Sequence, residues 1–592
     1  MRRLARVQWR KDDANIDRRK MEARAIPLLA ACATLLVAGT ARAATLGCDQ
    51  LMGLDIPATD IGLPTSGATV TSATVVPASG TGATMVTEHC TVMVRIHPVD
   101  PAAPDIIAQV NLPTAWNGKA VMFGGGGYDG VFSNNAAGGA GNYFNGPIDR
   151  PTALAQGYAT FASDSGHEAN GLGSQDGSFA LNQEALMNFS GYALKKARDV
   201  AVHLVEARYG TAPARSYFVG GSSGGREALW VVQNTPDDFD GAVAMYPAWN
   251  AATLDLFFGR TVRALARPDG YPNDAKKLVW MHAILDKCDK LDGVVDGLVS
   301  HVKACNFDPR TVRCPGGGDT GDTCLSDAQI GALELYGSDM KIPYPIGSGE
   351  TYYPGFNVLR GADLTGPLDM NLTQPTHELM TSDQAAAAAC TPATQSCPYK
   401  AMPYFAVFWD QWVKYFVTGD PTFDSLNLDP QQPGPYQQRI TDLTALQDVS
   451  GSDLSAFQRR GGKLILMHGL ADGLVSTDAT TQYYQRLKAA MGNPTVRSFV
   501  RYYTIPGLGH VFGAPFTGDP NNTGFTAAWD PLSAVAAWVE DGTAPGTLVA
   551  TDARGPHLGR TRPVCEYPGW PRYVGGDVNS AASFRCTAAR GD

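Results

Sequence analysis

Residues 217–229, YFVGGSSGGREAL, contain the glycine- and serine-rich turn on which the fold assignment depends. Three apolar residues at its start predict the end of a buried strand, and residues 226–232 predict a helix. Between them, Gly221, Ser223 and Gly225 fit the pattern G-x-S-x-G, which in a strand–turn–helix context is typical of a nucleophile elbow. Such a turn needs glycine where a Cβ would collide with neighbouring backbone. The stretch therefore predicts Ser223 as a nucleophile at a helix N-terminus, and the alternative is an ordinary glycine-rich turn.

Two later loops supply the partners that a serine nucleophile needs. The predicted strand 464–467 leads into a loop that holds Asp472, and the predicted strand 499–504 leads into a loop that ends at His510. The order Ser, acid, His, each after its own strand, is that of an α/β-hydrolase. We predict a triad in which His510 accepts the proton of Ser223 and Asp472 orients the imidazole.

The acid and the histidine also have simpler interpretations when each is taken alone. Asp472 precedes a glycine, which is common in turns, and His510 alone would be an ordinary loop histidine. Asp410 and Asp442 are weaker candidates for the acid, because neither follows an obvious core strand. The coincidence of three suitable residues after three strands favours the triad.

Strand and helix signals alternate along much of the chain. Further strands are predicted at residues 106–112, 120–123, 158–163 and 241–245, and helices at 185–209 and 534–540. Alternation of this kind predicts a parallel sheet with right-handed crossovers. The predicted fold class is therefore α/β, an α/β-hydrolase fold.

A run of four glycines follows the predicted strand 120–123 directly. A phosphate-binding loop also places glycines after a strand, but the Lys-Ser/Thr of a P-loop is missing here. In an α/β-hydrolase the loop after an early strand supplies a backbone amide to the oxyanion hole. We therefore predict oxyanion donors at Gly224 and at Gly126 or Gly127, and the alternative is a merely flexible loop.

The length of 592 residues exceeds that of one ordinary domain. From residue 250 to residue 457 the alternation stops and aromatic residues become dense, so we predict a lid domain there. It would separate two parts of the hydrolase core, residues 44–249 and 458–592. Candidate substrate contacts form the densest aromatic cluster of the lid: Tyr404, Phe405, Phe408, Trp409 and Trp412. Their spacing also suits a helix packed on the core, so only about half are expected to line a pocket.

The N-terminus has the features of an export signal. Residues 1–43 combine a basic start, an apolar run at 26–39 and a small-x-small cleavage site. Residues 1–20 are a mis-assigned extension if Met21 is the true start. The apolar run is too short to span a bilayer, so no membrane association is expected after cleavage. We predict a secreted or periplasmic protein, with a lipoprotein anchored at Cys32 as the alternative.

Composition limits the partners and suggests disulfides. A net charge of -10 argues against a nucleic-acid partner, because no basic stripe is available to replace counterions. No organic cofactor is expected.

Ten cysteines remain after signal removal, an even number for an oxidising compartment. Local spacing suggests the pairs Cys48–Cys90, Cys288–Cys305, Cys314–Cys324, Cys390–Cys397 and Cys565–Cys586.

Several segments together resemble the tannase and feruloyl esterase family. They are LPTAWNGKAVMFGGGG, GYATFASDSGH, ARSYFVGGSSGGREALW, PDDFDGAVAMYPAWN, CDKLDGVVDGLV, HGLADGLVS, IPGLGH and AAWVEDGTAP. They are spread over residues 106–548, in the order of the family. The resemblance implies a secreted serine esterase with a lid over an α/β-hydrolase core, and a structural calcium ion in the lid.

The resemblance also implies the calcium ligands. They would be the carboxylates of Asp289, Asp292 and Asp296 with the carbonyls of Val294 and Leu298, a mixture that calcium accepts. The loop is not an EF-hand, because its twelfth position is not glutamate. The alternative is a solvated acidic loop.

In one respect the chain departs from the family. Members resembling it carry one cysteine just before the serine and another just after the histidine, joined as a disulfide. With Ser223 as the nucleophile, these positions hold Ser222 and Val511. Both cysteines are absent together, so no unpaired thiol is expected.

The sequence thus predicts a secreted serine carboxylesterase for esters of aromatic acids, of the feruloyl, galloyl or terephthalate-monoester type. No arginine lies between Arg360 and Arg439, and the only lysines there are Lys400 and Lys414. A lid arginine for the carboxylate of a terephthalate monoester is therefore not evident. The alternatives are a broad aliphatic or polyester-fragment esterase and a non-catalytic binding protein with a hydrolase fold.

Overall fold

The computed structural model describes residues 45–131, 146–365, 374–381, 402–510 and 524–587. The chain from Ala44 onward forms one compact unit. The predicted signal peptide and the predicted pair Cys390–Cys397 lie outside the described residues.

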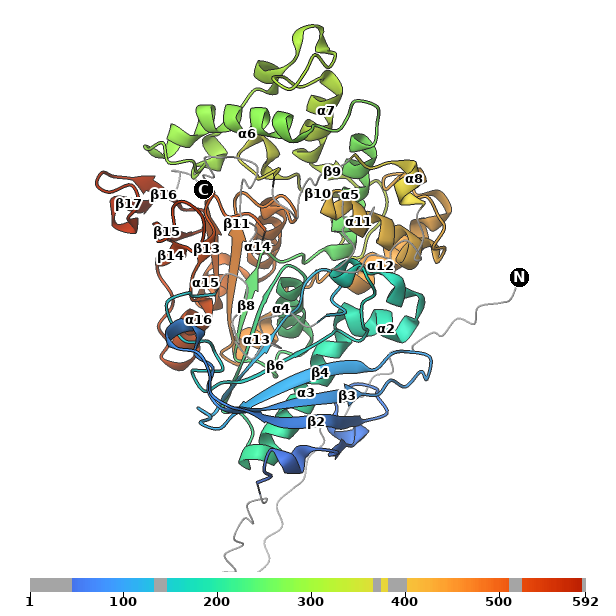
Figure 1. The fold of residues 1–592 in the computed structure, drawn as a ribbon, viewed down its shortest axis with the longest axis vertical. Coiled ribbons are helices and arrows are strands. Elements are labelled where there is room, and N and C mark those ends of the chain that lie inside the picture. Colours follow the sequence, from blue (N-terminus) through green and yellow to red (C-terminus); the bar gives the residue numbers. More distant parts are fainter. Residues whose placement is uncertain (1–44, 132–145, 366–373, 382–401, 511–523, 588–592) are drawn as a thin grey trace, which may run out of the picture. The chain divides into compact units, whose positions relative to one another are not determined.

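In the described part of the chain, thirteen strands join in one mixed sheet (Figure 1). In spatial order they are β1 (Asp55–Ile56), β2 (Ala68–Val76), β3 (His89–Ile96), β4 (Ile106–Pro113), β6 (Ala159–Ser163), β5 (Lys119–Phe123), β7 (Arg215–Gly221), β8 (Gly241–Met245), β11 (Lys463–Gly469), β12 (Val500–Ile505), β15 (Thr561–Glu566), β14 (Leu548–Asp552) and β13 (Ala527–Ala528). From β6 to β12 all neighbours are parallel, whereas β4 and β15 pair antiparallel with this centre. The carboxyl ends of the parallel strands therefore meet at one edge of the sheet.

Side chains of the central strands alternate between two hydrophobic cores, as the period of two in a strand requires. In β8, Ala244 belongs to a core shared with α3 (Ala193–Tyr209) and α4 (Ser223–Asn234). Val243 belongs to another core, shared with α16 (Pro531–Glu540). Helices thus cover both faces of the parallel centre.

The helix predicted at residues 185–209 is interrupted. α2 (Gln183–Met187) and α3 are joined by the π-helical turn η6 (Asn188–Tyr192), in which Gly191 has a φ of 145°. A Cβ at Gly191 would lie 2.2 Å from the Trp230 ring, so glycine permits this close approach and breaks the helix. The apolar periodicity continues across the break, which is why the sequence pattern did not reveal it.

The chain between β8 and β11 is mainly helical and, among its described residues, adds no strand to the large sheet. Its elements are α5 (Ala251–Leu265), α6 (Asp274–Cys288), α7 (Asp327–Tyr336), β9 (Met340–Lys341), β10 (Tyr352–Tyr353), α8 (His377–Met380), α11 (Tyr404–Gln411), α12 (Gln437–Gln447) and α13 (Ser455–Arg459). α5 packs against α11, α12 and α7 around one aromatic-rich core. Figure 1 shows this segment in green to orange, with α6 and α7 beyond the end of β11.

Four of the predicted disulfides are confirmed. Cys48–Cys90, Cys288–Cys305, Cys314–Cys324 and Cys565–Cys586 are bonded. The last of these ties β15 to the hairpin of β16 (Trp570–Tyr573) and β17 (Phe584–Thr587). Among the described residues, the remaining α-helices are α14 (Thr477–Met491) and α15 (Asn493–Phe499), which both lie between β11 and β12 in the chain.

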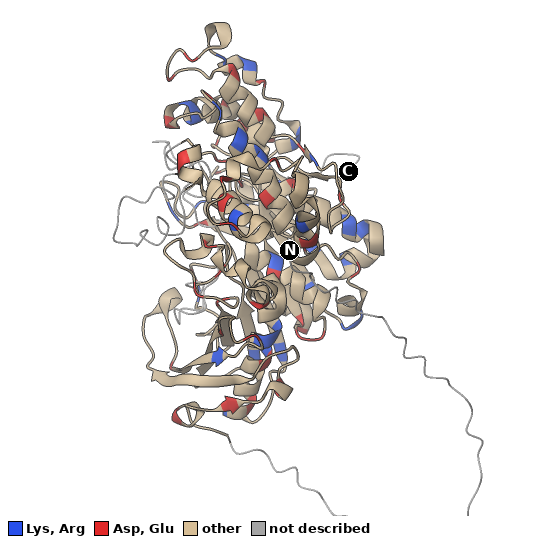
Figure 2. Cartoon of the chain, turned by 90° about the vertical axis from the view of Figure 1, so that its right-hand side faces the viewer, with Lys and Arg blue, Asp and Glu red and all other residues tan. Residues whose placement is uncertain are grey.

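Lys and Arg residues are interspersed with Asp and Glu in the view of Figure 2. In the ranges that the structure describes, no helix combines the length and the apolar character needed to cross a bilayer.

Candidate active site

Ser222 occupies the sharp turn between β7 and α4, with φ 61° and ψ −124°. A left-handed φ is rare for a residue with a Cβ and costs on the order of 1–3 kcal/mol. The surroundings hold the turn, because the Ser222 N–H donates to the Met245 carbonyl at 3.0 Å. A Cβ at Gly220 would lie 2.3 Å from the carbonyl oxygen of Gly224, so glycine lets the strand and the helix approach. This strained elbow presents the side chain of Ser222.

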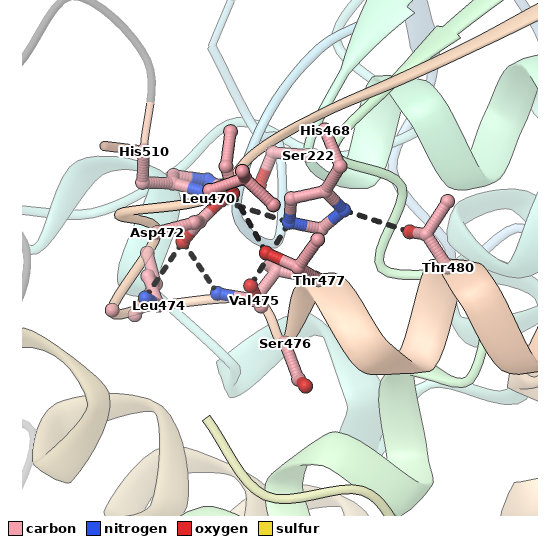
Figure 3. Close-up of polar contacts among 12 residues, drawn as sticks. Ser222, His468, Leu470, Asp472, Leu474, Val475, Ser476, Thr477, Thr480 and His510 are labelled. Atoms are coloured by element: carbon pink, nitrogen blue, oxygen red, sulfur yellow. Dashed lines mark hydrogen bonds and ion pairs between the residues drawn. The ribbon is translucent and has the colours of Figure 1, made fainter. Parts of the chain in front are cut away.

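The side chains of Ser222, His510 and Asp472 meet in one hydrogen-bonded chain (Figure 3). His510 Nε2 lies 2.9 Å from Ser222 Oγ, and His510 Nδ1 lies 2.8 Å from Asp472 Oδ2. The three residues follow β7, β11 and β12, which are parallel strands with their carboxyl ends at the same edge of the sheet. Asp472 is 1% exposed and His510 is 4% exposed, so the contact between these two residues is shielded from water, whereas Ser222 is half-buried.

The predicted pairing of Ser223 with His510 is wrong in this structure. Ser223 Oγ instead donates to the carbonyl oxygen of Gly127 at 2.5 Å. The sequence GGSSGG fits G-x-S-x-G in two overlapping registers, one from Gly220 and one from Gly221. Only the first places a serine in the strained turn, and that serine is Ser222.

The same one-residue shift corrects the predicted cysteine positions. The residue just before the serine in the elbow is Gly221, not Ser222. Val511, the position after His510, lies outside the described residues.

His468 is a buried neighbour of the site that the sequence analysis missed. Its Nε2 lies 3.2 Å from Asp472 Oδ2 and 3.0 Å from the Val475 carbonyl, and its Nδ1 lies 2.8 Å from Thr480 Oγ1 (Figure 3). Burial raises the pKa of Asp472, but the charges and hydrogen bonds of His510 and His468 outweigh it and hold this pKa well below its usual range. Asp472 is therefore ionised beside His510.

Backbone amides near Ser222 differ from the predicted oxyanion donors. The Gly224 N–H donates to the Gly125 carbonyl at 3.2 Å, so it is already used. No described residue accepts a hydrogen bond from the backbone N–H of Ser223, Gly126 or Gly127. Ser223 follows Ser222 directly at the first position of α4, where a helix leaves its N–H groups without partners. The available amides are therefore those of Ser223, Gly126 and Gly127.

Two buried carboxyl groups, those of Asp129 and Glu227, lie next to Gly125 in the glycine loop. Glu227 Oε2 accepts the Gly125 N–H at 3.0 Å. Burial raises the pKa of both Asp129 and Glu227, and the Glu227 charge raises that of Asp129 further. The charge state of one carboxyl therefore affects the titration of the other. The sequence pattern gave no signal of this pair.

Ser222 and His510 open into a cavity of about 270 Å³. Its walls are mainly apolar and come mostly from α5, α11, the loop 126–128 and the loop after Asp472. Among the lining residues are Leu254, Phe258, Tyr404, Phe408, Leu474 and Val475.

Two of the five predicted lid aromatics, Tyr404 and Phe408, line this cavity. Phe405, Trp409 and Trp412 do not line it but are fully buried in the lid core. Residues four apart share a helix face, which explains why Tyr404 and Phe408 point the same way. The helix therefore divides the cluster between pocket and core.

Asp255 brings a carboxyl group to the cavity wall. Its Oδ2 accepts a hydrogen bond from the Tyr128 hydroxyl at 3.1 Å, while its Oδ1 bonds to none of the described residues. Asp255 is only 4% exposed, and burial raises its pKa well above the usual range. No Lys or Arg belongs to the described lining, so an anionic group would find no cation there.

The predicted calcium loop has oxygen donors suited to a cation, and one of its carboxylates is paired with an arginine. Asp292 Oδ2 is buried without a hydrogen-bond partner among the described residues, and burial raises the pKa of Asp292 to about 7 and that of Asp289 to about 6. Asp296 Oδ2, however, lies 2.5 Å from Arg562 Nη2. In the described part of the chain, no three His, Cys, Asp or Glu side chains are placed to hold a metal ion. The unpartnered Asp292 Oδ2 nevertheless fits a cation, and the loop is a candidate calcium site.

Comparisons with known proteins identify related esterases. The profile of the family "Tannase and feruloyl esterase" matches residues 90–587. An uncharacterized esterase of Agrobacterium fabrum is 36% identical over 554 residues, with 91% of this chain and 92% of the relative covered. The mono(2-hydroxyethyl) terephthalate hydrolase of Piscinibacter sakaiensis is 30% identical over 555 residues, with 86% and 87% covered. Among solved structures, feruloyl esterase B from Aspergillus oryzae superposes with a TM-score of 0.68 at 23% identity, over 91% of this chain and 99% of that one.

The family match covers most of the chain, including Ser222, Asp472 and His510. The likeness to a solved esterase and the mixed sheet with helices on both faces confirm the predicted α/β-hydrolase fold. The chain belongs to the tannase and feruloyl esterase family and is a carboxylic ester hydrolase.

Proposed function

We propose that the protein hydrolyses esters of aromatic carboxylic acids through an acyl-enzyme formed on Ser222. The observation that carries this proposal is the chain of contacts from Ser222 through His510 to Asp472. In this geometry His510 accepts the Ser222 proton while Asp472 fixes its tautomer and stabilises the imidazolium.

The reaction has two halves with the same proton carrier. Ser222 Oγ bonds to the ester carbonyl carbon as its proton passes to His510 Nε2. The bond from that carbon to the alcohol oxygen then breaks, and His510 returns the proton to the leaving alkoxide. Water repeats the attack on the acyl-enzyme, releases the acid and restores the Ser222 hydroxyl. The amides of Ser223 and of Gly126 or Gly127 would stabilise the oxyanion in both halves.

The cavity supports a substrate with a neutral aromatic group. Tyr404, Phe408 and Phe258 offer ring and edge contacts, and Asp255 offers the free Oδ1. Relatives named for feruloyl esters and for mono(2-hydroxyethyl) terephthalate point to aromatic acids as well. Without a cation in the described lining, a carboxylate-bearing acyl group is disfavoured relative to a hydroxylated one.

A panel of small esters tests this function. Methyl ferulate, methyl gallate and methyl cinnamate are expected to be hydrolysed faster than a terephthalate monoester, with Ser222→Ala as the inactive reference. Turnover of short aliphatic esters alone would favour the broad esterase instead. No turnover of any ester would contradict the proposal.

Substitution of Asp255 with leucine tests the polar group in the cavity. We expect kcat/KM for methyl 4-hydroxycinnamate to fall about tenfold, because a buried hydroxyl loses its partner. Methyl cinnamate, which lacks the hydroxyl, should change less than about threefold by the same argument. Equal losses for both esters would show that Asp255 does not contact the ring substituent.

We also propose that the loop of Asp289, Asp292, Val294, Asp296 and Leu298 binds calcium. A ligand held at about 100 times its dissociation constant stabilises the folded state by about 2.7 kcal/mol, so EGTA should lower Tm by a few degrees. Calcium, but not magnesium, should restore it, and Asp292→Asn should abolish the response. Thermal unfolding measured with and without EGTA, together with elemental analysis, checks this. Metal-free protein with an unchanged Tm would remove the calcium proposal.

Export is the remaining part of the proposal. Residues 1–43 have the pattern of a signal peptide. The four described disulfides support this, because such bonds persist in oxidising compartments.

A further inference from the structure

Tyr246 lies between the elbow and His510, and its place depends on the absence of a side chain at Gly221. Tyr246 directly follows β8 and has a left-handed φ of 34°, which is uncommon for a residue with a bulky side chain. Its N–H donates to the Met467 carbonyl of β11 at 2.5 Å, and it is fully buried. The backbone is therefore tied to two strands that flank the site.

The Tyr246 ring fills the space that a side chain at Gly221 would need. In the sheet, Gly221 is the partner of Met245, the residue just before Tyr246. An ideal Cβ at Gly221 would lie 2.6 Å from Cε2 of Tyr246, 2.7 Å from its hydroxyl oxygen and 2.8 Å from Cζ. Real Cβ atoms do not approach other atoms so closely, so the ring and a side chain at residue 221 exclude each other.

The same ring packs against the imidazole of the triad. The ring centroids of Tyr246 and His510 are 4.8 Å apart, with an angle of 59° between their planes. The ring centroid of Tyr246 also lies 6.4 Å from that of His468. Burial raises the pKa of the Tyr246 hydroxyl well above its usual range, and the charge of Asp472 raises it further, so the ring stays neutral.

We propose that Tyr246 is a positioning residue that holds the His510 ring against Ser222, and that Gly221 and Tyr246 form a steric pair. This inference rests on the proposed function, because it concerns the reaction of Ser222. Asp472 restrains the Nδ1 side of His510 through one hydrogen bond, and a single hydrogen bond does not by itself fix the tilt of the ring. Tyr246 supplies the lateral contact that limits this tilt. A displacement of about 1 Å in a reacting group is enough to lower a rate about a hundredfold.

Variants at residues 246 and 221 test the proposal in the full-length protein. Tyr246→Phe keeps the ring and should retain kcat within about threefold, whereas Tyr246→Ala should lower kcat about a hundredfold with little change in KM. Tyr483→Ala is the matched control, because Tyr483 is also fully buried but packs against Trp249 rather than His510. It should leave a similar cavity and nearly normal kcat. If Tyr246→Ala does not fold, Tyr246→Leu serves as the test variant instead, because leucine keeps apolar volume but has no ring.

The steric pair predicts a specific interaction between two substitutions. Gly221→Ala should lower kcat strongly in the wild-type background, because the added methyl group displaces the ring. In the Tyr246→Ala background, the same change should alter kcat by less than about threefold, since the clash is gone. Independent effects of the two substitutions would overturn the steric pair.

The wild-type protein and Ser222→Ala separate this inference from the proposed function. An inactive wild-type protein would contradict the function itself. Activity that depends on Ser222, combined with normal kcat in folded Tyr246→Ala or Tyr246→Leu, would overturn the positioning role alone.

Discussion

Ser222→Ala is expected to abolish ester hydrolysis, with kcat/KM at least about 10⁴-fold below that of the wild-type protein. The reason is the contact of 2.9 Å between Ser222 Oγ and His510 Nε2, which is the path for the proton in both halves of the reaction. KM for any residual activity should change little, because the cavity walls remain. Initial rates with methyl ferulate measure the loss, and circular dichroism shows whether the variant is folded.

Ser223→Ala is the matched control for this result. The two serines are adjacent and of the same size, but Ser223 Oγ bonds to the Gly127 carbonyl rather than to His510. Its removal takes one hydrogen bond from the glycine loop and leaves the Ser223 N–H in place, so kcat should fall by about tenfold or less. If Ser223→Ala were inactive and Ser222→Ala active, Ser223 would be the nucleophile, as the sequence motif predicts. The assignment of Ser222 from the structure would then be wrong.

Asp472→Asn is expected to lower kcat by about 10⁴-fold while leaving the fold intact. Asp472 Oδ2 accepts from His510 and His468, and Oδ1 accepts the amides of Leu474 at 2.8 Å and Val475 at 2.9 Å. An amide has the same shape but no charge, so it favours the wrong tautomer of His510 and does not stabilise the imidazolium. Discontinuous assays at high enzyme concentration measure the residual rate of ester hydrolysis.

Asp442→Asn provides the comparison, because Asp442 was another candidate for the acid. It lies on α12, is exposed and accepts a hydrogen bond from Gln438 Nε2 at 2.9 Å, and it is not among the described hydrogen-bond partners of His510. This variant should be as active as the wild-type protein. Equal losses in both variants, or a fully active Asp472→Asn, would show that Asp472 is not the acid.

Much of the scaffold could be predicted from local signals in the sequence. Apolar runs bounded by turn residues located β5, β8, β11 and β12, and the positions after β11 and β12 gave Asp472 and His510. These predictions worked because each depends on a short stretch that behaves the same way in any parallel sheet. The nucleophile itself was misplaced by one residue, because GGSSGG satisfies the motif twice. Only the backbone conformation of Ser222 separates the two registers.

Other features depend on residues that are distant in the sequence. The cavity joins Tyr128, Asp255 and Phe408, which come from three elements, and no periodicity reveals such a meeting. The contact between Gly221 and Tyr246 likewise arises from the pairing of two strands. Tertiary packing decides these contacts, and a single sequence carries no local trace of it.

None of the four described disulfides includes a residue next to Ser222, Asp472 or His510 in the chain. Among the described residues, the loops of the triad are therefore held by noncovalent contacts. We therefore expect thiol reductants to lower the thermal stability of the protein more than its initial rate of ester hydrolysis. Protein made in a reducing host should have a lower Tm than the oxidised protein, with a similar initial rate for the fraction that folds.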